Sequence, residues 1–149
     1  MTDGIFTIML AEDDDNDVFF VRRALKTAKI HNPVIVVKDG AQAIDYLRGD
    51  GPYADRQQYP MPKLALLDIK MPKQTGLEVL NWLRTNENEG LKRLPVIIMS
   101  SSNQQQDIDR AYELGVKAYL VKPGGFVELV DILKKTTDFW RDTAAHPAV

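Results

Sequence analysis

The chain contains no cysteine, which excludes disulfide bonds, thiolate metal ligands and cysteine nucleophiles. No apolar run approaches the roughly 20 residues that a membrane-spanning helix needs, and the first residues lack the basic and apolar segments of a signal peptide. Positive charge is not in excess, because the net charge is -2, so nucleic-acid binding lacks its main driving force. We therefore expect a cytoplasmic protein that binds neither a membrane nor nucleic acid.

The composition is that of an ordinary globular protein, with 44% hydrophobic and 27% charged residues in a length of 149. This length favours one domain. We predict a single domain over residues 1–149, with its core over about 5–140 and a C-terminal tail over 141–149.

Short apolar segments alternate with segments whose apolar residues recur at helical spacing. The apolar segments are nearly continuous, as the strands of a parallel sheet covered on both faces must be. Right-handed crossovers between such strands give an α/β fold, a doubly wound five-stranded parallel sheet with helices on both faces. The predicted strands are 5–11, 34–37, 64–67, 95–99 and 118–121, and the predicted helices are 15–30, 40–48, 76–87, 104–114 and 125–140.

Polar side chains follow most of the predicted strands, at the edge where ligands bind in sheets of this kind. Glu12 and Asp13 follow the first strand and Asp68 follows the third, while Ser100 and Lys122 belong to the ends of the last two. Carboxylates suit a hard cation such as Mg²⁺, and a lysine can pair with phosphate. A carboxylate can also accept a phosphoryl group covalently, so the set indicates phosphoryl transfer.

The first of these strand ends opens a crowded run of acids, AEDDDND. For Asp14, Asp15 and Asp17 we favour a structural role, because acids before and within the first turn of a helix cap it and complement its dipole. Considered alone, Glu12 and Asp13 fit a helix cap and a metal site equally well.

Four segments, AEDD, LLDIKMPKQTG, LPVIIMSSS and AYLVKP, resemble in content and order the signatures of the response-regulator receiver domain of two-component signalling. The most specific is the spacing of Asp68, Met71, Pro72 and Gly76. The resemblance covers essentially the whole chain and implies the flavodoxin-like strand order 2-1-3-4-5.

The resemblance implies roles for the metal and phosphate residues. Asp68 corresponds to the phosphoacceptor, Asp13 to a direct Mg²⁺ ligand, and Glu12 to a second acid that acts largely through water. Lys70 stands where the family uses a backbone carbonyl as a metal ligand, so its side chain should not abolish binding. Mg²⁺ is the implied cofactor.

The resemblance also implies a switch. Ser100 corresponds to the hydroxyl that turns toward the phosphoryl group, Tyr119 to the aromatic residue that changes rotamer with it, and Lys122 to the phosphate-pairing lysine. Tyr119 could instead be a half-buried packing residue. The family further implies a cis bond between Lys122 and Pro123, although cis is uncommon even before proline.

Two features go beyond a minimal receiver domain. A Gly- and Pro-rich loop over 49–63, entered through YLRGDGPY, resembles cyanobacterial response regulators that partner phytochrome histidine kinases; it either recognises a partner or is a spacer. In the last helix, Ile132 and Phe139 fall away from the core-facing stripe and suggest a homodimer surface. The alternative is that Phe139 and Trp140 pack the helix end.

We favour a stand-alone response regulator without an output domain. It would accept a phosphoryl group on Asp68 from a phosphohistidine of a sensor histidine kinase and then change a protein-interaction surface. It would not be an enzyme beyond its own phosphotransfer and autodephosphorylation. A haloacid-dehalogenase-type phosphatase also uses an Asp nucleophile and Mg²⁺, but it needs an acid where Lys70 stands. The intact acids, hydroxyl and lysine disfavour a pseudo-receiver that binds partners without phosphorylation.

Overall fold

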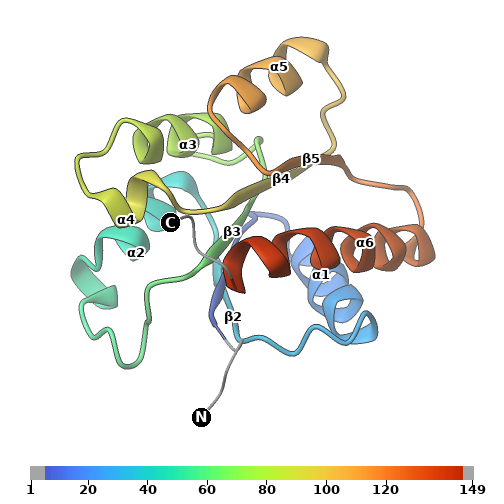
Figure 1. Ribbon diagram of the computed structural model, residues 1–149, viewed down its shortest axis with the longest axis horizontal. Helices are drawn as coiled ribbons and strands as arrows, with labels where there is room; N and C mark the ends of the chain where they lie inside the picture. The colour runs from blue at the N-terminus through green and yellow to red at the C-terminus, as the bar shows by residue number, and fades with distance from the viewer. Residues whose placement is uncertain (1–5, 146–149) are drawn as a thin grey trace.

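A parallel sheet forms the centre of the computed structural model, which describes the backbone of residues 6–145 and the side chains of residues 6–136. The strand order is β2-β1-β3-β4-β5 (Figure 1), which confirms the predicted fold class and topology. The strands are β1 (Ile8–Ala11), β2 (Val34–Val37), β3 (Leu64–Leu67), β4 (Val96–Ser100) and β5 (Ala118–Val121).

The helices that connect these strands are α1 (Asp15–Thr27), α2 (Gly40–Arg48), α3 (Gly76–Arg84), α4 (Glu89–Lys92), α5 (Gln105–Glu113) and α6 (Phe126–Ala145). Figure 1 shows α1 and α6 together on one face of the sheet, with α2, α3 and α5 on the other. Each face has its own apolar cluster, so the strands are buried on both sides. No helix among the described residues has the length and apolar content that crossing a bilayer requires.

The structure contains two short elements that the sequence pattern did not predict. These are a 3-10 helix, η1 (Gly51–Tyr53), and the single-turn helix α4. In α4 the Asn88 side chain accepts a hydrogen bond from the Leu91 N–H at 3.1 Å, and Leu91 is buried. One turn is too short to show a helical period, so only the cap and this buried leucine distinguish it from a loop.

The loop between α2 and β3 is held by its own side chains. The Arg56 guanidinium donates hydrogen bonds to the carbonyl oxygens of Tyr46 and Leu47, both at 2.8 Å, and of Tyr59 at 3.1 Å. It thereby satisfies carbonyl groups at the C-terminal end of α2. The rings of Tyr46, Tyr53 and Tyr59 meet edge to face. Residues that suggested partner recognition therefore make contacts within the molecule.

Candidate functional site

Three site residues stand one position beyond the ends of β1, β3 and β5. Backbone hydrogen bonds continue past the strands at these positions: the Glu12 N–H donates to β2 at 3.0 Å, the Asp68 N–H to β1 at 3.0 Å, and the Lys122 N–H to β4 at 2.8 Å. The sheet therefore fixes all three main chains at one edge. This is the edge at which the sequence predicted a site.

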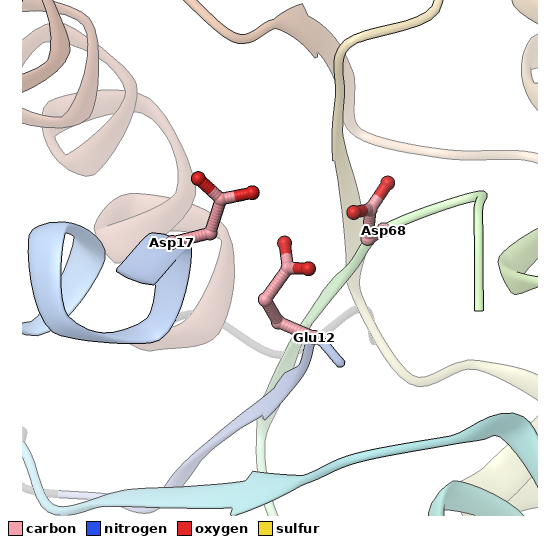
Figure 2. A group of neighbouring side chains, drawn as sticks. All are labelled: Glu12, Asp17 and Asp68. Atoms are coloured by element: carbon pink, nitrogen blue, oxygen red, sulfur yellow. The ribbon is translucent and has the colours of Figure 1, made fainter. Parts of the chain in front are cut away.

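The Lys122 ammonium is the centre of the site. Its Nζ donates to Glu12 Oε1 at 2.5 Å, to Asp17 Oδ2 at 2.8 Å and to Asp68 Oδ2 at 3.0 Å. Figure 2 shows Glu12 and Asp68 at neighbouring strand ends and Asp17 on the first turn of α1. Oxygens of the three carboxylates lie within 4.8 Å of one another. The structure thus joins three distant parts of the sequence around one cation.

Negative charge exceeds positive charge at this buried position. The Glu12 and Asp68 side chains are only 3% and 8% exposed. Burial raises the pKa of Glu12 from 4.5 to about 7; the hydrogen bond from Lys122 opposes this rise, and the nearby Asp68 adds to it. Burial alone would lower the pKa of Lys122, but hydrogen bonds to Asp17, Glu12 and Asp68 outweigh burial and raise it above 10.5.

The donor set fits a hard divalent cation. Glu12, Asp17 and Asp68 offer carboxylate oxygens close to one another, and one ammonium does not balance their charge. Ions such as Mg²⁺ prefer oxygen ligands and bind through a few carboxylates together with water. A second cation at this edge would relieve the repulsion that burial intensifies.

The backbone behind Asp68 explains the glycine in the sequence motif. The Gly76 N–H donates to the Ile69 carbonyl at 3.0 Å, which closes the chain back on itself. A Cβ atom at Gly76 would lie 2.2 Å from the Asp68 carbonyl oxygen, so any side chain there would displace Asp68. The Lys70 N–H donates to Asp68 Oδ1 at 3.3 Å, while the Lys70 side chain is exposed. The buried Met71 anchors the same loop in the core.

The acidic run divides differently from the prediction. Asp14 caps α1, because its side chain accepts the Asp17 N–H at 3.0 Å, and Asp15 pairs with the exposed Lys38. Both agree with a structural role. Asp17 does not, because its side chain enters the site. Asp13 is exposed and is not one of the three grouped carboxylates. The only sequence signal for Asp17 was its place three residues after the N-cap residue Asp14. A side chain at that helix position can reach back toward the start of the helix.

A hydrogen-bonded chain leads from the site toward the surface. Ser100 is fully buried, and its Oγ accepts the Ser102 N–H at 3.2 Å. The Ser102 carbonyl accepts the Tyr119 hydroxyl at 2.8 Å, and the Tyr119 N–H donates to the hydroxyl oxygen of Tyr112 at 3.2 Å. Tyr119 is half-buried, and its hydroxyl group is hydrogen-bonded to the loop that carries Ser102.

Two predictions about the C-terminal part have different outcomes. The predicted cis bond between Lys122 and Pro123 is wrong, because the peptide bond is trans. Trans is the ordinary preference before proline, and the Lys122 side chain reaches the carboxylates from it. In the predicted dimer surface, Ile132 is half-buried, and Phe139 lies outside the residues whose side chains are described. That surface stays a prediction.

Comparisons with known proteins agree with this geometry. Residues 8–134 match the response regulator receiver domain family. The chain is 36% identical over 141 residues to the response regulator Rcp1 of Synechocystis sp., covering 95% of this chain and 92% of Rcp1. The crystal structure of the phosphorylated cyanobacterial phytochrome response regulator RcpA matches with a TM-score of 0.82 and 35% identity, covering 93% of this chain and 96% of RcpA.

A solved structure also bears on the cation. The Mn²⁺-bound form of Rcp1 matches with a TM-score of 0.80 and 35% identity, covering 93% of this chain and 96% of that one.

The family match spans most of the chain, and the similarity to Rcp1 spans nearly all of it. The chain therefore belongs to the response regulator receiver domain family.

Proposed function

We propose that the protein is a response regulator that accepts a phosphoryl group on Asp68 from a phosphohistidine of a sensor histidine kinase. In the transfer, the P–N bond of phosphohistidine breaks and a P–O bond to an Asp68 carboxylate oxygen forms. The convergence of three carboxylates on the Lys122 ammonium carries this proposal. Transfer of this kind depends mainly on positioning and on charge neutralisation. The protein would catalyse this transfer and the loss of its own phosphoryl group, and no separate reaction.

We propose Mg²⁺ as the cofactor. When bound, it would neutralise charge on the phosphoryl oxygens. As the family resemblance implies, Asp13, Asp68 and the backbone carbonyl of Lys70 would be direct ligands, and Glu12 would act largely through water. The grouped carboxylates and the similarity to the Mn²⁺-bound form of Rcp1 support this assignment. Lys122 would turn part of its hydrogen bonding from the Asp68 carboxylate to the phosphoryl group.

The switch would run through the chain from Ser100 to Tyr119. The Ser100 oxygen accepts a hydrogen bond from Ser102, and its own hydroxyl hydrogen is not used in that contact. Turning this hydrogen toward a phosphoryl oxygen would pull on the loop whose carbonyl holds Tyr119. A local charge change would thereby alter the surface formed by α5 and β5.

We further propose that this protein acts in the cytoplasm and that its kinase is of the phytochrome type. The similarity to RcpA over nearly the whole of both chains supports this assignment. We also propose that the chain forms a homodimer through the face of α6 that carries Ile132 and Phe139. Signals would then leave through protein contacts or phosphate relay.

The proposed chemistry can be tested without the kinase. The protein is incubated with Mg²⁺ and phosphoramidate, and its intact mass is followed. We expect an acid-stable, base-labile phosphoryl adduct that is lost with chelator and in Asp68→Asn. Asp15→Asn, which changes an exposed acid that pairs with Lys38, should still form the adduct. An unmodified wild type, or an Asp68→Asn protein that keeps the adduct, would overturn the proposal.

A further inference from the structure

The hydrogen-bonding capacity of the Lys122 ammonium is fully used. A lysine ammonium has three N–H donors, and those of Lys122 reach Glu12, Asp17 and Asp68. These partners come from three elements: the ends of β1 and β3, and the first turn of α1. The lysine side chain is 17% exposed. Its position is therefore set by three carboxylates and not by water.

Two of these partners are used by the proposed chemistry. Asp68 becomes an acyl phosphate when it accepts the phosphoryl group, so its oxygens lose charge and become poorer acceptors. Glu12 would help to hold the cation and would share its charge between that ion and Lys122. Asp17 is the remaining partner, and its backbone is held separately, because the Asp14 side chain caps its N–H at 3.0 Å.

The surroundings of Lys122 give its side chain room to move. A cavity of about 250 Å³ lies beside the ion pair of Asp17 and Lys122, and Phe20 and Gly124 are among the other residues that line it. A Cβ atom at Gly124 would meet no neighbour within 4 Å. Packing therefore does not fix the lysine on this side, and a charged hydrogen bond is the available restraint.

We propose that Asp17 is a positioning residue that keeps the Lys122 ammonium aimed at Asp68 throughout phosphotransfer. The N–H that Asp68 releases can then pass to the incoming phosphoryl group, while the N–H bound to Asp17 stays in place. This inference rests on the proposed function, which it deepens, because it assigns to α1 a part in the transfer.

Asp15 provides the matched control. It lies in the same helical turn and also forms an ion pair, but its partner is Lys38, and its side chain is 89% exposed. A general effect of acids on the helix dipole would appear equally in Asp15→Ala and Asp17→Ala. Only Asp17→Ala removes a partner of Lys122. Asp17→Asn keeps an acceptor oxygen without the charge and serves as the conservative variant.

The first measurement is the ¹H–¹⁵N spectrum of the lysine ammonium groups with Mg²⁺ present. We expect a slowly exchanging Lys122 signal, identified by its absence in Lys122→Met. Its hydrogen exchange should become roughly threefold to tenfold faster in Asp17→Ala, the factor that a partly exposed ion pair supplies. It should be unchanged in Asp15→Ala. An unchanged Lys122 signal in Asp17→Ala would overturn the inference, whatever the outcome of phosphorylation.

The second measurement is the rate of adduct formation from phosphoramidate at saturating Mg²⁺. We expect Asp17→Ala to be roughly threefold to tenfold slower than wild type, Asp17→Asn to be intermediate, and Asp15→Ala to equal wild type. Equal rates for Asp17→Ala and Asp15→Ala would overturn the inference and leave the proposed function intact. So would a deficit that disappears as Mg²⁺ is raised, because Asp17 would then act as a cation ligand. A wild type without adduct would overturn both.

Discussion

At the scale of single residues, burial opposes the ionisation of the Glu12 carboxyl group. It is the most buried of the carboxylates around Lys122, and burial raises its pKa to about 7. Unfolding would return this pKa to 4.5. Between these values the native protein holds more protons on Glu12 than the unfolded chain does, so stability must fall as pH rises.

This sign gives a test in metal-free protein. From pH 5 to pH 8 the contribution of Glu12 to the free energy of unfolding should fall, by up to about 3 kcal/mol. Lys122 stays charged throughout this range, because its pKa is raised. Urea unfolding with chelator present would compare wild type with Glu12→Gln, which has no carboxyl proton to lose. We expect the wild type to lose stability relative to the variant as pH rises; a constant difference would contradict the assignment.

The sequence identified most of the site residues but not all of them. Asp68, Glu12 and Lys122 could be predicted to meet, because the ends of parallel strands share one edge and the motifs mark them. Asp17 could not be separated from Asp15, since both are acids in the first turn of a helix. Which of them reaches Lys122 depends on how α1 lies across the sheet, and this is set by packing between distant parts of the chain.

At the scale of elements, the loop between α2 and β3 is a clamp on the end of α2. Arg56 donates to two carbonyl groups of that helix and lies 5.7 Å from the centre of the Tyr46 ring. Gly49 ends the helix with φ 73, and a Cβ atom there would come within 2.8 Å of the Arg56 guanidinium. Such contacts between residues of a loop have no periodic signature, so the sequence predicted only an irregular segment.

The clamp predicts a stability effect. Arg56→Ala would remove the guanidinium donors of the Leu47 and Tyr59 carbonyl groups, while the Tyr46 carbonyl would keep the Gly49 N–H at 3.1 Å. We therefore expect the free energy of unfolding to fall by about 2 kcal/mol. Arg48→Ala is the control, because it removes an exposed pair with Asp50 at 3.5 Å and should cost less than about 1 kcal/mol. Urea unfolding at one pH measures both. Equal losses would mean that Arg56 is not a clamp.

At the scale of the whole molecule, the order of the strands decides which residues meet. The apolar pattern indicated a doubly wound parallel sheet, but the order 2-1-3-4-5 came from the resemblance of four motifs. Because β1 and β3 are adjacent, Glu12 and Asp68 stand at neighbouring strand ends. Lys122 follows β5, the outermost strand of the sheet, and its side chain reaches both carboxylates. The spacing of hydrophobic residues alone contains no information on the order of the strands, since every strand is mainly apolar.

The proposed homodimer belongs to the same scale. We expect light scattering to give about twice the chain mass of 16.8 kDa for wild type, and a single chain mass for Phe139→Asp. A charge placed in an apolar contact has no partner and opposes association. Lys134→Asp alters an exposed residue of the same helix and should leave the dimer intact. The same mass for all three proteins would contradict the predicted surface.

The most direct test of phosphoryl transfer to Asp68 is the position of the phosphoryl group in the modified protein. Wild-type protein treated with phosphoramidate and Mg²⁺ would be reduced with borohydride, which converts an acyl phosphate to an alcohol, and then digested for peptide mass spectrometry. We expect homoserine in place of Asp68, and unmodified Glu12, Asp13 and Asp17. Reduction at any other acid, or none at Asp68 in protein that carries the adduct, would contradict it.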